Sequence, residues 1–133
     1  MRTDDMNKAR TRILHVEDDA SLQNLVRVAL EQLGGYEVRT AADGPSALSQ
    51  AREFAPQLVL LDLDLPGMSG IETLVALRAI ESLRDIPAVF LTAAADPRVL
   101  DELHALGAHV VRKPFRPRPL VETLARVLAR KES

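Results

Sequence analysis

The segment LVLLDLDLPGMSG, residues 58–70, decides the fold because it combines a buried strand with an acidic turn. Four aliphatic residues open it, as in a strand that is covered on both faces of a sheet. Asp62 and Asp64 follow, and Pro66 with two nearby glycines then ends the strand. Asp62 therefore stands at the carboxyl end of a central strand, where it either marks the point at which the strand reaches water or serves chemistry.

Five strand-like segments alternate with five helix-like segments along the chain. The predicted strands are 13–17, 36–40, 57–62, 88–92 and 109–113, and the predicted helices are 21–33, 45–54, 69–81, 97–106 and 119–130. Parallel strands separated by helices need crossover connections, which are right-handed and place helices on both faces of the sheet. The sequence thus predicts an α/β three-layer sandwich with a parallel five-stranded sheet.

Strand composition predicts the order of the sheet. Residues 57–62 and 88–92 are almost continuously apolar, as in central strands, whereas residues 36–40 alternate and residues 109–113 end in charge, as in edge strands. This pattern fits the flavodoxin-like (βα)5 order 2-1-3-4-5. That order places a crevice between the carboxyl ends of the first and third strands.

The first helix is expected to be amphipathic, with Asp19 capping its start and two glycines, Gly34 and Gly35, ending it. Its apolar residues recur at the spacing of one helical face, which we expect to be buried: Leu22, Leu25, Val26, Ala29, Leu30 and Leu33. Among the three histidines, His15 is expected in packed surroundings, and His104 and His109 at the surface.

Composition narrows the possible functions. The chain has 133 residues, no cysteine and a net charge of −2, which indicates one domain without disulfide or thiolate chemistry and without a field that attracts nucleic acid or an anionic membrane. The N-terminus lacks an apolar signal region, and no apolar run is long enough to cross a membrane. We therefore expect a cytoplasmic protein with an N-terminal tail at 1–11 and one domain at 12–131.

Polar residues with chemical potential follow four of the predicted strands. Glu17 and Asp18 end the first strand, Asp62 the third, Thr92 the fourth and Lys113 the fifth, so all should meet at one edge of the sheet. Crowded carboxylates repel one another, and a shared proton or a cation would relieve that repulsion. Because the donors are hard oxygens, the expected ion is Mg²⁺.

Magnesium beside a carboxylate and an ammonium group predicts phosphoryl transfer. The Asp62 carboxylate can attack phosphorus, while Mg²⁺ and Lys113 supply positive charge to the equatorial oxygens and Thr92 donates a hydrogen bond. The expected product is an aspartyl phosphate.

Four motifs in this order and spacing resemble the receiver domain of two-component response regulators, in particular single-domain, chemotaxis-regulator-like members. They are ILHVEDD (13–19), LLDLDLPGMSG (60–70), FLTAAAD (90–96) and VVRKPF (110–115). The resemblance implies that Asp62 is the phosphoacceptor. It also implies that Asp18 and Asp62 bind Mg²⁺ directly through their carboxylates, that Glu17 acts through a metal-bound water, and that Asp64 contributes its backbone carbonyl as a ligand.

The same resemblance assigns the switch and the partners. Thr92 and Lys113 would hold the phosphoryl group, and Lys113-Pro114 would be a cis peptide bond. The phosphoryl donor would be a phosphohistidine on a sensor histidine kinase or a histidine phosphotransfer protein. An unknown downstream protein would be reached through the fourth helix, fifth strand and fifth helix, with no DNA-binding or catalytic output domain in this chain and no enzymatic turnover.

One position departs from the family pattern. Receiver domains usually carry an aromatic residue three positions before the lysine, and here that residue is Val110. A valine has no ring to turn inward on phosphorylation. We therefore expect that the readout of phosphorylation is weak or uses other movements.

Three alternatives fit parts of the same sequence. A calcium-binding EF-hand is disfavoured because Pro66 and Thr73 occupy ligand positions of that loop. A haloacid-dehalogenase-type phosphatase shares the DLD motif at 62–64, but its motif lies near the chain start and its extra acidic pair comes late. A receiver-fold scaffold without phosphorylation is supported only by Val110.

Overall fold

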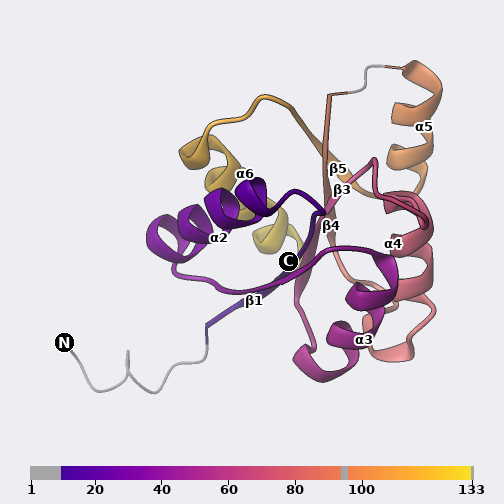
Figure 1. Cartoon of the computed structure of the whole chain (residues 1–133), viewed down its shortest axis with the longest axis horizontal. Coiled ribbons are helices and arrows are strands. Elements are labelled where there is room, and N and C mark those ends of the chain that lie inside the picture. The colour runs from indigo at the N-terminus through magenta and orange to yellow at the C-terminus, as the bar shows by residue number, and fades with distance from the viewer. Residues whose placement is uncertain (1–9, 94–95, 133) are drawn as a thin grey trace.

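The structure, a computed structural model, describes residues 10–93 and 96–132 and contains one parallel five-stranded sheet (Figure 1). The strands are β1 (Arg12–Val16), β2 (Glu37–Ala41), β3 (Leu58–Asp62), β4 (Ala88–Thr92) and β5 (His109–Arg112). Their order is β2-β1-β3-β4-β5, which confirms the predicted flavodoxin-like fold and both predicted edge strands. The predicted tail at 1–11 lies outside the described residues, apart from Arg10 and Thr11.

Helices cover both faces of this sheet. They are α2 (Ala20–Gly34), α3 (Gly44–Phe54), α4 (Gly70–Arg78), α5 (Pro97–Ala105) and α6 (Pro117–Glu132), with a short 3₁₀ helix η1 (Glu81–Leu83). Figure 1 shows α2 and α6 on one face of the sheet and α3, α4 and α5 on the other. The predicted three-layer sandwich is therefore confirmed.

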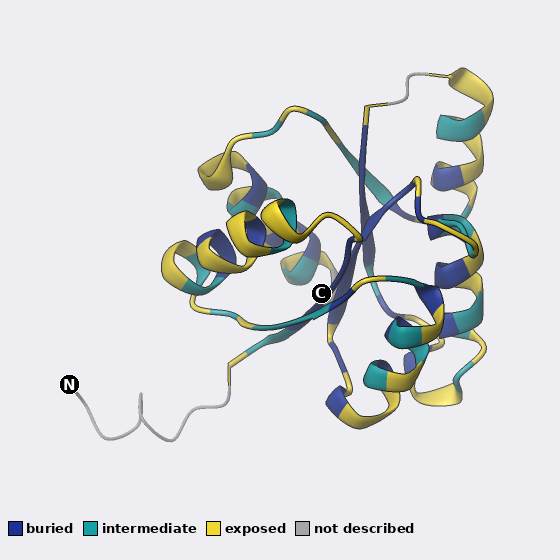
Figure 2. Ribbon diagram, in the orientation of Figure 1, coloured by how far each residue is buried: buried dark blue, intermediate teal, exposed yellow. Residues whose placement is uncertain are grey.

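Alternating side chains of the strands fill two separate cores. Leu58 and Leu60 of β3 pack on the side of α2 and α6, and Val59 and Leu61 pack on the side of α3, α4 and α5. All four are fully buried, and Figure 2 shows the central strands as the most buried part of the chain. Burying each such side chain contributes about 1.5–3 kcal/mol, so β3 is held firmly at the centre of the sheet.

Side-chain caps fix where helices begin beside the strand ends. Asp19 accepts a hydrogen bond from the Leu22 N–H at the start of α2, which confirms its predicted capping role. Gly35 adopts a left-handed conformation that ends α2, as the two glycines predicted. Ser69 and Glu72 form a capping box at the start of α4.

Two helix predictions need correction. The helix expected at 69–81 ends at Arg78. The chain then turns and places Leu83 of η1 in the core, where it is buried.

In α2, only the middle of the predicted apolar face is buried. Leu25 and Leu33 remain 49% and 45% exposed, because the sheet and α6 cover a narrower stripe than the sequence pattern offers.

Candidate functional site

The predicted site residues lie at the carboxyl edge of the sheet. Glu17 follows β1, Asp62 ends β3 and Thr92 ends β4, while Lys113 comes directly after β5. The main chain ties these ends together: the Lys113 N–H donates to the Thr92 carbonyl at 2.9 Å, one residue beyond the paired part of β5. Since β1 and β3 are neighbours that connect to opposite sides of the sheet, the site lies at the topological switch point.

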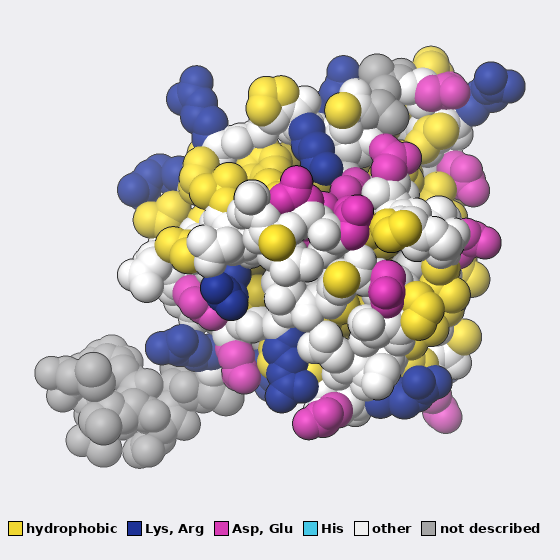
Figure 3. All heavy atoms as spheres, viewed as in Figure 1, with side chains coloured by type: hydrophobic (Ala, Val, Ile, Leu, Met, Phe, Trp, Pro, Cys, Tyr) yellow, Lys and Arg dark blue, Asp and Glu magenta, His cyan; other side chains and the backbone are white. Residues whose placement is uncertain are grey.

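Three carboxylates from two strands form one acidic cluster. Glu17, Asp18 and Asp62 each offer an oxygen, and these oxygens lie within 4.8 Å of one another. Glu17 and Asp62 are buried, whereas Asp18 is exposed. Figure 3 shows acidic side chains gathered on this face of the molecule.

Glu17 is buried with a hydrogen bond to only one of its two carboxylate oxygens among the described residues. Its Oε2 accepts a hydrogen bond from the Asp19 N–H at 3.1 Å, but its Oε1 is buried without a partner among the described residues. Burial raises the pKa of Glu17 to about 7, and the charges of Asp62 and Asp18 add to the rise, while the Asp19 N–H and Lys113 oppose it. A divalent cation would neutralise this cluster, and its hard oxygen donors are those that Mg²⁺ prefers, so the residues present fit the ion.

Asp62 is held in a fixed orientation by two contacts. Its Oδ2 lies 3.3 Å from the Lys113 Nζ, and its Oδ1 accepts a hydrogen bond from the Asp64 N–H at 3.1 Å. The carboxylate is therefore presented between a cation on one side and the turn after β3 on the other. The side chain of Asp64 is exposed, so only its backbone takes part in this arrangement.

The backbone of Gly70 packs against the backbone of Asp62. Sequence reasoning did not single out Gly70. A Cβ at Gly70 would clash with the carbonyl oxygen of Asp62, because the first turn of α4 lies directly against the end of β3. The Gly70 N–H also donates to the Leu63 carbonyl at 3.1 Å. A glycine eight residues after a strand-end aspartate, at the start of a capped helix, is the signal that could have revealed this contact.

The remaining predicted residues lie around the same edge or below it. Thr92 is 1% exposed at the end of β4, and the Lys113-Pro114 peptide bond is cis. Val110 is half-buried in β5 and pairs with Phe90 of β4, two residues before Thr92 along that strand. Val110 therefore lies away from the acidic cluster.

His15 lies in the core and outside the cluster. It is fully buried in β1, and neither ring nitrogen has a partner among the described residues. Burial, with the nearby Lys113, lowers the pKa of His15 to about 3, so the imidazole is neutral. Its packed position confirms the prediction. His104 is exposed as expected, whereas His109 is half-buried because β5 carries it against α6.

This fold and this edge of the sheet define a receiver domain, with an acidic cluster, a hydroxyl group and a lysine at the carboxyl ends of parallel strands. The family model of the response regulator receiver domain matches residues 13–125. The chain therefore belongs to the response regulator receiver domain family.

Curated relatives are longer than this chain. The DNA-binding response regulator MtrA of Mycobacterium tuberculosis is 43% identical over 126 residues, which are 94% of this chain and 52% of MtrA. The phosphate regulon transcriptional regulatory protein PhoB of Escherichia coli is 41% identical over 122 residues, with 90% and 52% covered. The chain spans about half the length of the curated relatives it matches.

Solved structures match over nearly their whole length. The chemotaxis protein CheY4 of Vibrio cholerae has a TM-score of 0.84 and 37% identity, with 90% of this chain and 99% of that chain covered. The receiver domain of the sensor histidine kinase PA1611 of Pseudomonas aeruginosa, solved with a magnesium ion in the active site cleft, has a TM-score of 0.80 and 30% identity, with 92% and 99% covered. In the described part of this chain, none of the helices has the length and apolar character needed to cross a membrane.

Proposed function

We propose that Asp62 accepts a phosphoryl group from a phosphohistidine on a sensor histidine kinase or a histidine phosphotransfer protein. One observation carries this proposal: the Asp62 carboxylate lies 3.3 Å from the Lys113 ammonium and within the cluster formed with Glu17 and Asp18. An Asp62 oxygen would attack phosphorus as the phosphorus–nitrogen bond breaks, and the leaving imidazole would take a proton.

Magnesium would be held by the carboxylates of Asp18 and Asp62, by the backbone carbonyl of Asp64 and by Glu17 through a water molecule. When bound, the ion supplies positive charge to the phosphoryl oxygens during transfer. The hydrogen bond from the Asp64 N–H to Oδ1 orients the Asp62 carboxylate for attack. The positive charge of the ion would offset the electrostatic cost of burying Glu17, whose Oε1 has no partner among the described residues.

Lys113 and Thr92 would hold the transferred group. The Lys113 ammonium exchanges its present partner, the Asp62 carboxylate, for a phosphoryl oxygen that carries more charge. Thr92 contributes its hydroxyl, and the hydrogen bond between the Lys113 N–H and the Thr92 carbonyl keeps the two residues together. Val110 supplies no ring, so the output would depend on movements of the backbone and of other side chains.

The wider proposal follows from the family. The domain would occupy residues 12–131 after a tail at 1–11 and would act in the cytoplasm as a signalling module without catalytic turnover. Its downstream target would be a protein, contacted directly without nucleic acid or membrane. Two rival functions remain distinguishable by experiment: an unphosphorylated scaffold and a phosphatase.

Incubation with Mg²⁺ and acetyl phosphate, followed by intact-mass measurement, tests this proposal. The wild type and an Asp64→Asn variant, whose altered side chain is exposed, should each gain one phosphoryl group, and Asp62→Asn should gain none. Absence of an adduct with acetyl phosphate and with a phosphorylated histidine phosphotransfer protein would favour the scaffold. Sustained release of phosphate from small esters would favour the phosphatase.

A magnesium titration separately tests the metal ligands. Asp18→Ala should weaken Mg²⁺ binding, whereas Asp43→Ala, which changes a helix cap on α3, should not. Unchanged affinity in Asp18→Ala would remove Asp18 from the site.

A further inference from the structure

The corner between β1 and α2 carries two of the three acids of the cluster, and it is tied by a residue that the proposed function does not use. That residue is Gln23, a half-buried glutamine in the first turn of α2. Its Nε2 donates a hydrogen bond to the backbone carbonyl of Glu17. A helix side chain thus reaches back to the end of the strand that the helix follows.

This hydrogen bond holds the peptide group that joins Glu17 to Asp18. A peptide group is planar and nearly rigid, so fixing its oxygen restrains the Cα atoms on both of its sides. Those Cα atoms belong to Glu17 and Asp18, whose carboxylate oxygens lie within 4.8 Å of one another and of an Asp62 oxygen. One donor on this carbonyl therefore restrains both acids.

Two further hydrogen bonds close a ring around the corner. The Gln23 N–H donates to the Asp19 carbonyl at 2.9 Å, and the Asp19 N–H donates to the Glu17 Oε2 at 3.1 Å. With the Gln23 amide on the Glu17 carbonyl, the ring links three residues through backbone and side-chain atoms. Loss of the Gln23 amide would open this ring at Glu17.

The end of β1 needs this restraint because the crowded carboxylates repel one another. Glu17 lies one residue beyond the last registered pair of β1 and β3, which is Val16 with Leu61. Its N–H donates to the Ala41 carbonyl of β2 at 2.9 Å, and Gln23 holds its carbonyl. The position of Glu17 therefore depends on contacts beyond the ladder between β1 and β3.

Gln50 makes the same kind of contact at a strand outside the site. Its Nε2 donates to the Thr40 carbonyl of β2 at 2.9 Å, from the helix α3 that follows this strand. Its side chain is half-buried, like that of Gln23. The acidic cluster lies at the ends of β1 and β3, so Gln50 ties a helix to a strand without holding an acid of the cluster.

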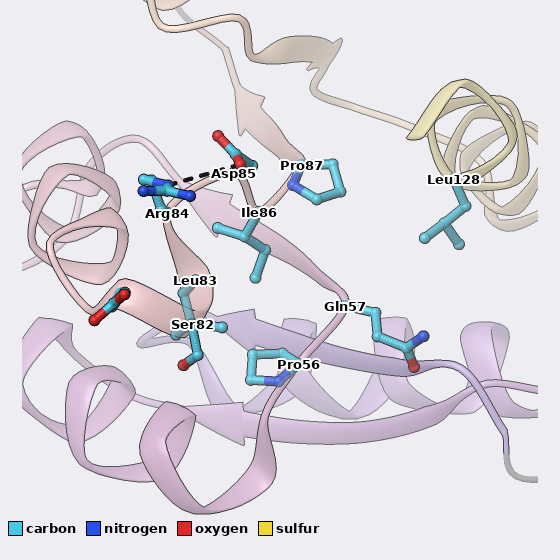
Figure 4. Close-up of a pocket in the computed structure, with 10 residues that line it drawn as sticks. Pro56, Gln57, Ser82, Leu83, Arg84, Asp85, Ile86, Pro87 and Leu128 are labelled. Atoms are coloured by element: carbon cyan, nitrogen blue, oxygen red, sulfur yellow. Dashed lines mark ion pairs between the residues drawn. The ribbon is translucent and has the colours of Figure 1, made fainter. Parts of the chain in front are cut away.

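A third glutamine binds the opposite end of β1. The Gln57 Oε1 accepts a hydrogen bond from the N–H of Arg12, the first residue of the strand, at 3.0 Å. Gln57 also lines a cavity of about 420 Å³, and Figure 4 shows it among the residues around that cavity. Side-chain amides thus tether both ends of β1, and the tether at the carboxyl end is the one that holds the acids.

We propose that Gln23 is a positioning residue for the Mg²⁺ site. By holding the peptide group between Glu17 and Asp18, its amide keeps both carboxylates beside Asp62 before the ion binds, which lowers the cost of assembling the site. Gln23 itself contacts neither the ion nor phosphorus. This inference rests on the proposed function only for the use of the ion in phosphoryl transfer, because the metal affinity can be measured without phosphorylation.

Isothermal titration calorimetry with Mg²⁺ tests this role in Gln23→Met, which keeps the length of the side chain and removes the amide donor. The dissociation constant should rise by about fivefold, the equilibrium effect of one lost hydrogen bond. The control Gln50→Met, which loses the equivalent bond to Thr40, should change it by less than about 1.5-fold. Unchanged affinity in Gln23→Met, or an equal rise in both variants, would overturn the proposal.

Hydrogen exchange in EDTA tests the ring in the metal-free protein. The Asp19 amide should exchange about fivefold faster in Gln23→Met, because its acceptor on Glu17 is no longer held, and at the wild-type rate in Gln50→Met. The two variants should have similar midpoints of urea unfolding, since each loses one hydrogen bond to a backbone carbonyl. Weaker Mg²⁺ binding with wild-type exchange at Asp19 would contradict restraint of Glu17 as the cause.

Phosphoryl uptake from acetyl phosphate, followed by intact mass, separates the positioning role from the chemical step. Gln23→Met should need about fivefold more Mg²⁺ for its half-maximal rate and should reach the wild-type rate at saturating Mg²⁺. A rate that stays low at saturation, with an unchanged half-saturating concentration, would refute the positioning role. If the wild type binds Mg²⁺ but gains no phosphoryl group, while Gln23→Met still weakens Mg²⁺ binding, the proposed function fails and the positioning role stands.

Discussion

Replacing Glu17 with glutamine should stabilise the metal-free protein at alkaline pH. The wild-type side chain is 1% exposed, and its pKa rises from an ordinary value of 4.5 to about 7. At 1.36 kcal/mol per pH unit, this rise corresponds to about 3 kcal/mol lost when the folded protein must ionise Glu17. Glutamine has the same shape, can accept the Asp19 N–H hydrogen bond and carries no charge.

The sign of the pH dependence follows from the direction of the pKa change. Below pH 4.5, Glu17 is protonated in both the folded and the unfolded state and costs nothing. Between pH 4.5 and 7 the unfolded state ionises first, so the folded state binds more protons and the stability of the wild type falls as pH rises. Above pH 7 the loss is complete. The advantage of Glu17→Gln should therefore be small at pH 4.5 and reach about 3 kcal/mol at pH 8.

Urea unfolding in EDTA at pH 4.5 and pH 8 measures this difference. Glu37→Gln is the matched control, because Glu37 is exposed on β2, and it should change stability by less than about 0.5 kcal/mol. Excess Mg²⁺ should stabilise the wild type more than Glu17→Gln, since binding to the folded state alone adds stability. The reasoning fails if Glu17→Gln is less stable than the wild type at pH 8, or if its advantage is the same at both pH values.

Three further substitutions test the surroundings of the site. Gly70→Ala should cost about 1–3 kcal/mol of stability in urea unfolding and reduce phosphoryl uptake, because its Cβ meets the Asp62 backbone; wild-type behaviour would show that α4 does not press on β3. His15→Leu should raise the midpoint of urea unfolding by an amount equivalent to about 1 kcal/mol or more, since it removes two buried nitrogens that have no partner among the described residues; a lower midpoint would indicate that the imidazole is paired. Asp19→Ala should cost about 1 kcal/mol through loss of the α2 cap, measured by thermal unfolding, and Asp19→Asn should retain most of that stability.

Sequence reasoning predicted the sheet because strand order is encoded locally. The unbroken apolar runs at 58–61 and 88–91 need cover on both faces of the sheet, which places these strands at its centre. Residues 109–113 end in charge and need no such cover, so this strand can lie at the edge. Parallel connections then bring the carboxyl ends of the strands to one edge, so Asp62 and Lys113 could be placed together from their strand positions alone.

Other features depend on distances that the sequence does not encode. That the Glu17 Oε1 has no partner among the described residues depends on how the side chain is buried in the folded protein. The close contact of Gly70 depends on the angle at which α4 begins, and the exposure of Leu25 on how far α6 extends over α2.

The shortness of β5 has a mechanical consequence. Its four residues span about 13 Å, with His109 at one end and Lys113 next to the other. Each residue of the strand is registered with one on β4, and the Lys113 N–H is bound to the Thr92 carbonyl, so β5 cannot slide along β4 without breaking these hydrogen bonds. A movement of Lys113 would therefore involve the ends of β4 and β5 together, without any aromatic ring at position 110.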